Sequence, residues 1–583
     1  MKKLIQSLSN GDLNIEEVPL PNIASNEILI SSSISLISSG TERKLYDFGK
    51  SSLLNKALNQ PDKVKEAINK VKSDGFFETY DAIQNKMNDP IPMGYSNVGT
   101  VIDVGSKVKD FSVGDRVVSN GSHSEINAVS SNLCAKIPNN VSDEDAVFTV
   151  LGSIALQGIR LANPDIGESF LVIGLGIIGL LTGQILKANG CRVFGIDPDN
   201  SKCKIAESFG IISKPDIDDI KSFCNKYNNG ELFDGVLITA STQSNEPLEI
   251  ASKITRQRGR IILIGDVGLN INRDLFYKKE LKFQVSCSYG LGRYNYEYEK
   301  LSLNYPIGFI RWTVKRNFQT ILALLEKNQL NVKSLISKTF DFRNSQEAYD
   351  FLLMKKSSLG ILLKYEKKIN NNFDGEKDIF IAKDSFNQSD IKCINKKPII
   401  NLIGAGNYAG RTLLPNLKKC DVELGQIISN NGLSSKLLGK RFNFKVATTD
   451  FETSFKNSNF DALFITTRHD THASLTLKCI ENKKHVFVEK PLCLTLKDLN
   501  LIKEKKLDNQ IIMVGFNRRF SKLIETLYKE LEKISDNKIF IYTINAGLLP
   551  DDHWLHDPVQ GGGRIIGEAC HFVDLLRFLS NGK

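Results

Sequence analysis

The sequence predicts an α/β fold built around two doubly wound parallel sheets, each beginning at its own glycine-rich turn. The first indication is SFLVIGLGIIG at residues 169–179, an apolar run that leads into a helical stretch and then a second apolar run, CRVFGID. The second indication is PIINLIGAGNYAG at residues 398–410, which repeats the order of strand, glycine turn, helix and strand. Short apolar strands that alternate with helices are typical of parallel sheets covered by helices on both faces.

The region before the first glycine turn has a different pattern. Its short strands are separated by Val-Gly and Gly-Asp turns, as in PIPMGYSNVGTVIDVGSKVKDFSVGDRV, which predicts a compact β-rich domain. Between the two repeats lies a polar segment rich in Asn, Asp and Lys, which is typical of an interdomain linker. The β-rich domain is predicted to span 1–150, and the chain is predicted to return to it at about 300–365; the first Rossmann-type domain lies between, at 151–300. The linker is predicted at 366–396. The second Rossmann-type domain follows at 397–520, and an incomplete α+β domain begins at 521–583.

The composition predicts a cytoplasmic enzyme with no nucleic-acid or membrane partner. Of the 583 residues, 41% are hydrophobic and 24% charged, and the formal net charge of +10 comes from Lys and Arg scattered among Asp and Glu. No basic arm with interleaved aromatic residues appears, and no apolar run approaches the length needed to span a bilayer. The 10 cysteines form neither CxxC pairs nor clusters with histidine, so they predict buried thiols in a reducing compartment.

The glycines of both turns are placed as dinucleotide binding requires. The first glycine of such a turn permits a tight bend, the second lets the backbone approach a pyrophosphate, and the third lets the helix pack close to the strand. The amide groups at the start of the following helix then point at the phosphates. The sequence therefore predicts two dinucleotide sites, with Gly174, Gly176 and Gly179 in the first and Gly404, Gly406 and Gly410 in the second.

The residue that ends the second strand of each repeat predicts the cofactor. Asp197 ends VFGID, where a carboxylate accepts hydrogen bonds from a ribose diol, so the first site is predicted to take NAD. The corresponding place in the second repeat holds Ser429, followed by Asn430 and Asn431, with Lys436 nearby. These residues tolerate a 2′-phosphate, so the second site is predicted to take NADP or NAD.

The first part of the chain, residues 1 to about 365, resembles the medium-chain dehydrogenase/reductase superfamily in the segments GTVIDVGSKVKDFSVGDRV, VLGSIALQGIR and GRIILIGDVG. The resemblance implies a GroES-like substrate domain beside an NAD-binding Rossmann domain. Zinc-dependent members carry a cysteine and a GHE motif as metal ligands, and here Ser38 and Tyr95 stand in those places. Neither is a usual zinc ligand, and the four-cysteine structural loop is absent, so we expect no zinc. Hydroxyl groups would then polarise a substrate carbonyl.

The second part of the chain resembles the Gfo/Idh/MocA family of sugar and inositol dehydrogenases. The resemblance is carried by five motifs in order, GAGNYAG, TTRHDTH, KKHVFVEKPL, GFNRRF and GGGRIIGEACHFVD. It implies that Glu489-Lys490-Pro491 ends a sheet strand beside the nicotinamide, often with a cis peptide before the proline. The residues that it implies for the cofactor site are Ser429, Thr467, His472, Glu489 and Pro491.

Within this resemblance, Lys490 and His571 are the predicted catalytic pair. Oxidation of a secondary alcohol needs hydride transfer to a nicotinamide and removal of the hydroxyl proton, and histidine is the natural base by its pKa. Lys490 can orient the oxygen and offset its developing negative charge. Glu568 and Asp574 lie three residues either side of His571 on a predicted helix, where a carboxylate can set its tautomer. The family's usual aspartate, four residues before the histidine, is replaced by Gly567.

These patterns together predict a two-site NAD(P)-dependent oxidoreductase. Its expected substrate is a secondary alcohol or ketone of a sugar, polyol or nucleotide sugar in carbohydrate or surface-glycan biosynthesis, and a homo-oligomer is expected. Two alternatives stay open at this point. The first half alone could act as a zinc-free carbonyl or quinone-type reductase, or one half could be a non-catalytic dinucleotide-binding scaffold or redox sensor.

The chain ends shortly after His571, whereas members of the resembled family continue into an open, mostly antiparallel sheet. We therefore expect a C-terminally truncated domain in which the helix bearing His571 exposes an apolar face made by Phe572, Leu575, Leu576 and Leu579. The second site is then expected to bind its cofactor but to catalyse poorly.

Overall fold

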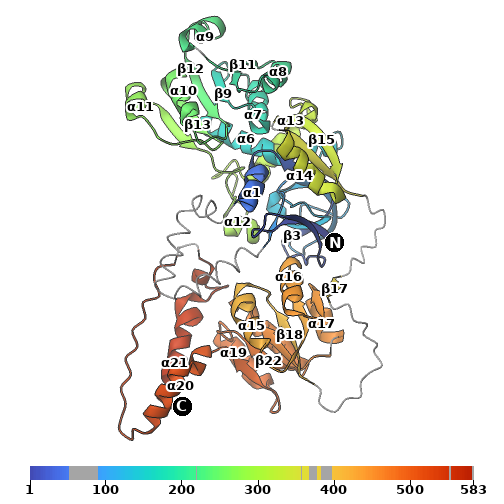
Figure 1. Ribbon diagram of the computed structural model, residues 1–583, viewed down its shortest axis with the longest axis vertical. Helices are drawn as coiled ribbons and strands as arrows, with labels where there is room; N and C mark the ends of the chain where they lie inside the picture. The colour runs from blue at the N-terminus through green and yellow to red at the C-terminus, as the bar shows by residue number, and fades with distance from the viewer. Residues whose placement is uncertain are drawn as a thin grey trace. The chain divides into compact units, whose positions relative to one another are not determined.

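The computed structural model describes residues 1–51, 90–217, 219–355, 357–366, 377–381, 397–457, 459–549 and 553–580. The chain forms two compact units (Figure 1). The first comprises Met1–Glu17 and Ile23–Phe373, and the second comprises Val18–Asn22 and Asp374–Lys583. Each unit contains one doubly wound α/β sheet, as the sequence predicts.

A β-rich layer opens the first unit. Its strands are β3 (Glu27–Ser38), β5 (Asn97–Val104), β6 (Arg116–Ser119), β7 (Ile126–Ser130), β8 (Cys134–Lys136), β15 (Ile336–Asp341) and β16 (Gly360–Lys364), beside a small sheet of β1 (Lys2–Gln6), β2 (Leu13–Glu17) and β4 (Ile91–Pro92). The larger sheet has the order β15-β16-β3-β5-β6-β8, with β7 paired to β3. Because β16 runs antiparallel to β3, the chain returns to this layer after the Rossmann sheet. Apolar side chains of β3 such as Ile28, Ile30 and Leu36 form part of the core.

The first doubly wound sheet is parallel throughout. Its strands are β9 (Ser169–Ile173), β10 (Arg192–Ile196), β11 (Ile212–Lys214), β12 (Phe233–Ile238), β13 (Thr255–Leu263) and β14 (Lys282–Val285), in the order β11-β10-β9-β12-β13-β14. The accompanying helices include α6 (Thr149–Ala162), α7 (Ile177–Ala188), α8 (Asn200–Ser208), α9 (Ile220–Tyr227), α10 (Glu246–Ile254), α11 (Arg273–Lys279), α13 (Val314–Glu326) and α14 (Ser345–Met354). The strand order reverses between β9 and β12, and dinucleotides bind outside the carboxyl ends of the strands at such a reversal.

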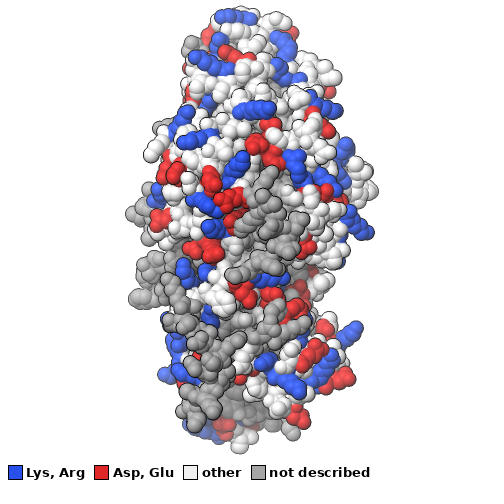
Figure 2. All heavy atoms as spheres, turned by 90° about the vertical axis from the view of Figure 1, so that its right-hand side faces the viewer, with Lys and Arg blue, Asp and Glu red and all other residues white. Residues whose placement is uncertain are grey.

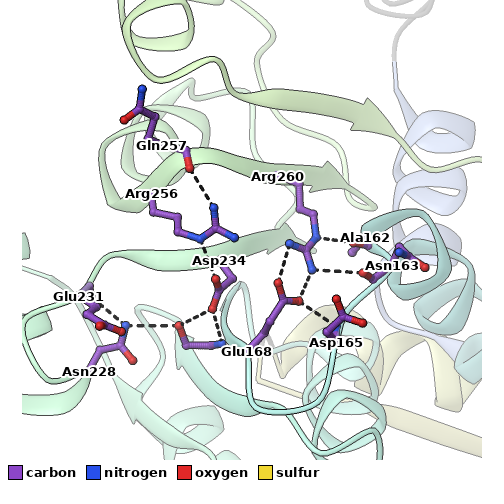
Figure 3. A network of polar contacts seen from close by, with 11 residues as sticks. Ala162, Asn163, Asp165, Glu168, Asn228, Glu231, Asp234, Arg256, Gln257 and Arg260 are labelled. Atoms are coloured by element: carbon purple, nitrogen blue, oxygen red, sulfur yellow. Dashed lines mark hydrogen bonds and ion pairs between the residues drawn. The ribbon is translucent and has the colours of Figure 1, made fainter.

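A polar network joins the amino-terminal ends of this sheet (Figure 3). Glu168, just before β9, forms a bidentate ion pair with Arg260 of β13, with Oε1 3.0 Å from Nη1. Asp234 of β12 accepts the Ser169 N–H at 2.8 Å and the Arg256 Nε–H at 2.7 Å. Because these bonds lie at the edge opposite the carboxyl ends, they stabilise the sheet without entering the dinucleotide crevice.

The second unit repeats the same strand order. Its strands are β17 (Asp378–Phe380), β18 (Ile399–Ile403), β19 (Glu423–Ile428), β20 (Val446–Thr448), β21 (Ala462–Ile465), β22 (His485–Val488) and β23 (Ile512–Val514), in the order β17-β20-β19-β18-β21-β22-β23. The helices between them are α15 (Leu414–Leu417), α16 (Leu433–Phe442), α17 (Phe451–Asn457), α18 (His469–Glu481) and α19 (Leu496–Lys505). All neighbouring strands are parallel except β17, which is antiparallel to β20.

The structure differs from the predicted linker at strand β17. It lies inside the predicted linker 366–396, yet it belongs to the second sheet because Ile379 pairs with Ala447 and Ile381 packs on the core around Ile427. Apolar side chains in the run DIFI give this short stretch a surface to bury. The predicted linker residues 367–376 and 382–396 lie outside the described residues.

Beyond residue 520, the described residues form helices and no strand. Helix α20 (Lys522–Glu532) comes first, and a π-helical segment, Ile565–Ala569, later runs directly into α21 (Cys570–Leu579). The predicted exposed apolar face of α21 is wrong at Leu575 and Leu579, which are 3% and 6% exposed. Phe572, on the same helix, packs against Tyr542 with ring centres 5.3 Å apart. Tertiary contacts within this unit therefore cover much of the face that the sequence leaves open.

The surface carries both signs of charge. On the face drawn in Figure 2, Lys and Arg side chains are interspersed with Asp and Glu across its described part. None of the described helices combines the length and the apolar character that crossing a bilayer requires.

Candidate functional site

The first glycine turn joins β9 to α7 and has the shape of a pyrophosphate cradle. Gly174 has a φ of +97°, and a Cβ there would lie 2.7 Å from Ala240 N. A Cβ on Gly179 would collide with Gly174 O, so both positions need glycine. Gly176 differs, since no heavy atom lies within 4 Å of a Cβ built on it. That open space lies at the N-terminus of α7, where amide groups have no partner within the helix, so the turn fits a dinucleotide pyrophosphate.

The second glycine turn follows β18 and repeats this geometry. Gly404 has a φ of +101°, and its Cβ would lie 2.5 Å from the carbonyl carbon of Thr466. Gly410 packs closely on Leu438, whose Cδ2 would be 3.0 Å from a Cβ, whereas Gly406 again has open space. Both predicted turns therefore form cradles of one kind, each at the strand reversal of its own sheet.

A threonine side chain hydrogen-bonds the first glycine of each cradle, and neither threonine was predicted from the sequence. Thr239 follows β12 and its Oγ1 donates to Gly174 O at 2.5 Å. Thr466 follows β21 and its Oγ1 donates to Gly404 O at 2.7 Å. The signal was present in the sequence, since an Ile-Thr pair ends the fourth strand of both repeats. These equivalent bonds extend the internal repeat beyond the glycines.

The predicted ribose-binding positions lie beside the cradles. Asp197 follows β10 and is 6% exposed, and its Oδ2 accepts the Leu175 N–H at 2.8 Å. Lys202 Nζ lies 3.4 Å from Oδ1, so the carboxylate is held against the turn. In the second unit Ser429 follows β19, and its Oγ accepts the Ser435 N–H at 3.2 Å. The first cradle is thus flanked by an anion and the second by a neutral hydroxyl.

Lys490 and Pro491 follow β22 and are joined by a cis peptide bond, as the resemblance implies. Lys490 Nζ donates to Gly567 O at 2.6 Å. His472 Nδ1 lies 2.7 Å from Pro491 O, and its Nε2 lies 3.1 Å from Thr467 O. A neutral imidazole has one N–H, so His472 donates to one of these carbonyls at a time. It links the strand end that carries Lys490 to the turn after β21.

His571, at the start of α21, lies near Lys490. Its Nδ1 is buried and has no hydrogen-bond partner among the described residues, and the Phe516 ring packs edge-on with its centre 6.0 Å away. Burial and then the positive charges of Lys490 and Arg518 lower the pKa of His571 to about 4. His571 is therefore a neutral imidazole at neutral pH, able to accept a proton.

The carboxylates predicted to orient His571 have other partners. Asp574 forms a bidentate ion pair with Arg519, with Oδ2 2.5 Å from Nε. Glu568 accepts the Arg564 Nε–H at 2.7 Å. In this structure neither carboxylate hydrogen-bonds His571 Nδ1, since both are engaged by charge-assisted arginine bonds. Asp574 acts on His571 through its charge, which opposes the lowering of the His571 pKa.

Glu489 connects the same strand end to the second glycine turn. Its carboxylate hydrogen-bonds Tyr408, which lies just after Gly406 in the turn, and burial raises the pKa of Glu489. It also packs on Gly515, where a Cβ would lie 2.9 Å from Oε1. Glu489 thus lies beside the second cradle, between β22 and β23.

His469 was not singled out from the sequence, yet it lies at this site. It is the first residue of α18, and its Nδ1 donates to Gly561 O at 2.9 Å. Burial lowers the pKa of His469 to about 4, so the ring is neutral. The Trp554 ring packs edge-on against it, with centres 4.8 Å apart. The available signal was its spacing of three residues from His472, which places both rings on one helix face.

The metal-ligand places of the first unit hold hydroxyl groups. Ser38 ends β3, Tyr95 lies before β5, and their side chains hydrogen-bond each other. Burial raises the pKa of Tyr95 to about 12, so it is a neutral phenol. Zinc sites use thiolate, imidazole and carboxylate ligands, and the described ranges contain no cluster of three or more such side chains able to hold a metal. These residues do not fit a zinc ion at this place.

Two doubly wound sheets, each with a glycine cradle at its strand reversal, define a dinucleotide-dependent oxidoreductase with two cofactor sites. Residues 400–516 match the family described as "Oxidoreductase family, NAD-binding Rossmann fold" of the Gfo/Idh/MocA group. Residues 67–159 match "Alcohol dehydrogenase GroES-like domain", and residues 178–303 match "Zinc-binding dehydrogenase". The chain belongs to the oxidoreductases that join an alcohol-dehydrogenase-like unit to a Gfo/Idh/MocA unit.

Several curated relatives are named as dehydrogenases. D-guloside 3-dehydrogenase of Escherichia coli (strain K12) is 30% identical over 269 residues, which cover 44% of this chain and 72% of that protein. Myo-inositol 2-dehydrogenase of Thermotoga maritima is 28% identical over 190 residues, 31% of this chain and 54% of that protein, so the chain spans about half of that relative. Sorbitol dehydrogenase 2 of Saccharomyces cerevisiae is 24% identical over 302 residues, 45% of this chain and 78% of that protein. The chain is accordingly an NAD(P)-dependent oxidoreductase acting on CH–OH groups.

Proposed function

We propose that the second unit interconverts a secondary alcohol and a ketone in a sugar, polyol or nucleotide sugar. The observation that carries the proposal is a neutral imidazole, His571, near the ammonium group of Lys490 and beside a dinucleotide cradle. By their names, the relatives act on a guloside, an inositol and sorbitol, which supports a hydroxyl-rich substrate. A role in carbohydrate or surface-glycan biosynthesis is part of the proposal.

Lys490 positions the substrate oxygen, and His571 takes its proton. An ammonium group has three donors and Gly567 O accepts one, so Lys490 can also donate to the substrate. The unpartnered Nδ1 of His571 supports its assignment as the base for the hydroxyl proton. A bound nicotinamide would supply the acceptor for the hydride of the carbinol carbon. In the reverse direction the protonated imidazole returns the proton while Lys490 stabilises the developing negative charge on oxygen.

The proposal assigns a cofactor to each cradle. The buried carboxylate of Asp197 supports NAD in the first, because it would repel a 2′-phosphate. Ser429 supports NADP or NAD in the second, because it carries no charge. The hydroxyls of Ser38 and Tyr95 support a first unit that works without zinc.

The proposal also covers assembly and location. Apolar side chains as exposed as Ile539, at 90%, and Ile541, at 89%, support a homo-oligomer. The described cysteines are free thiols, which supports a reducing cytoplasm. The mixed surface charge supports a small-molecule substrate over nucleic acid.

The test uses the 583-residue chain with Gly176→Val, so that the first cradle does not contribute. Oxidation of myo-inositol and sorbitol with NAD+ and with NADP+ is followed by absorbance of the reduced cofactor. Lys490→Ala and His571→Ala are each expected to lower kcat by about 100-fold or more with dinucleotide affinity kept. His485→Ala, a histidine on β22 that bonds Ile511 N, serves as the control and should turn over normally. Normal turnover by both catalytic variants would show that the chemistry lies elsewhere.

A further inference from the structure

The first unit contains a buried acid–base pair that the proposed function does not use. Glu42, on α1 (Thr41–Lys50), is 1% exposed, and His123 is 0% exposed. Glu42 Oε2 lies 3.0 Å from His123 Nε2. A carboxylate and an imidazole so far from water must share protons and hydrogen bonds with their neighbours, because isolated buried charges are costly. Their surroundings therefore show where a proton can enter and leave.

One end of the pair bonds the backbone of Ser38, which stands in a metal-ligand place. Glu42 Oε1 accepts the Ser38 N–H at 2.9 Å. The hydroxyls of Ser38 and Thr41 hydrogen-bond the Tyr95 hydroxyl, which also feels the charge of Glu42. Thr41 is exposed, whereas the Tyr95 hydroxyl is buried beside it. Thr41 is therefore the point at which this end meets the surface.

The other end of the pair leads away through hydroxyl groups. His123 Nδ1 lies 2.7 Å from Ser35 Oγ, which lies 2.9 Å from Tyr365 OH. Tyr365 lines a surface cavity of about 830 Å³ together with Asp341 and Glu366. Every member of this row can both give and take a proton. The row thus leads from Glu42 to Tyr365, a buried residue that lines this cavity.

Helix α1 also lies beside the first dinucleotide crevice. Its Lys44 forms an ion pair with Asp266, which follows β13. Asp266 in turn bridges to Ser241, just after β12. These loops leave the carboxyl ends of the parallel strands, where dinucleotides bind. Tyr95, beside the start of α1, is therefore on the side of the first unit that a nicotinamide would approach.

We propose that the first unit holds a second, metal-free dehydrogenase centre in which Tyr95 binds the oxygen of a secondary alcohol and the Glu42–His123 pair stores its proton. In oxidation the C–H bond breaks and its electron pair leaves with the hydride for the nicotinamide of NAD+. The O–H bond breaks as the C=O bond forms, and the proton passes by way of the Tyr95 hydroxyl to the pair. Ketone reduction is the reverse. Tyr95 is the catalytic residue, and Glu42 and His123 act through it as positioning residues.

The first experiment separates the two centres in the 583-residue chain. Lys490→Met removes the catalytic lysine of the second unit, and oxidation of sorbitol, xylitol, 2,3-butanediol and myo-inositol with NAD+ is then measured. We expect turnover of at least one probe to remain and to vanish when Gly176→Val is added. No turnover of any probe in the Lys490→Met chain overturns the proposal and leaves the proposed function of the second unit standing. If Gly176→Val alone removes all activity, the second unit is inactive and the first-unit centre stands.

The second experiment tests the residues in the Lys490→Met chain. Tyr95→Phe should lower kcat by about 100-fold, the range of general acid–base catalysis, with KM little changed. Glu42→Gln should lower kcat and enlarge the solvent deuterium isotope effect, and Glu42→Asp should recover part of the rate. Tyr298→Phe is the control, since Tyr298 is a buried tyrosine of the same unit that bonds Asn132 O at 3.3 Å. If Glu42→Gln does not fold, Tyr95→Phe decides, and an unchanged kcat there refutes the proposal.

Discussion

A valine in either glycine cradle should remove one dinucleotide site and leave the other intact. Gly176 and Gly406 are the two cradle glycines whose Cβ would meet no heavy atom within 4 Å. Gly176 has a φ of −67°, an ordinary value for any residue, so Gly176→Val causes no backbone strain. Its cost to the fold is the poorer helix cap, about 1 kcal/mol. The side chain nevertheless fills the space that the pyrophosphate needs.

The loss of affinity can be worked from the bonds that are displaced. A hydrogen bond to a charged group contributes about 1.5–3 kcal/mol. If one or two backbone bonds to the pyrophosphate are lost, binding weakens by about 3 kcal/mol, which is roughly a hundredfold in Kd. Each single variant should therefore bind one dinucleotide per chain where the unchanged chain binds two, and the double variant should bind none.

Isothermal titration of NAD+ and NADP+ into the 583-residue chain measures this stoichiometry. Gly308→Val is the matched control, because Gly308 also has open space around its Cβ but belongs to neither turn. The control should bind two dinucleotides and show the same thermal unfolding midpoint. Two sites of unchanged affinity in Gly176→Val or Gly406→Val would refute the cradle assignment for that unit.

Three further predictions concern charge and metal. In the pH profile of the second unit, kcat/KM should fall on the acid side near pH 4, because protonation of His571 below its lowered pKa removes the base. Arg518→Gln takes away a positive charge, so it should move this fall towards neutral pH. Asp197→Ser should raise the affinity of the first site for NADP relative to NAD, as measured by titration of the Gly406→Val chain; an unchanged ratio would contradict the assigned role. Elemental analysis should find no stoichiometric zinc, and chelators should leave activity unchanged, because Ser38 and Tyr95 do not supply zinc ligands; one tightly held zinc per chain would disprove this.

The sequence by itself determined the parts of this protein that depend on local pattern. Both glycine turns, the two doubly wound sheets and the motif that ends in Lys490 and Pro491 follow from residues close together in the chain, because a turn, a strand and a helix start are specified locally. The place of Asp197 at a strand end was predictable for the same reason. These features needed no knowledge of long-range contacts.

Only the tertiary structure decided which partners the charged groups take. Asp574 bonds Arg519 across 55 residues, and Glu42 meets His123 across 81 residues, so no local spacing points to either pair. Burial is likewise a property of the whole unit. It makes His571 neutral and covers Leu575, although a helix pattern alone leaves that face open. The physical reason is that desolvation and ion pairing depend on what packs from distant segments, which local sequence does not encode.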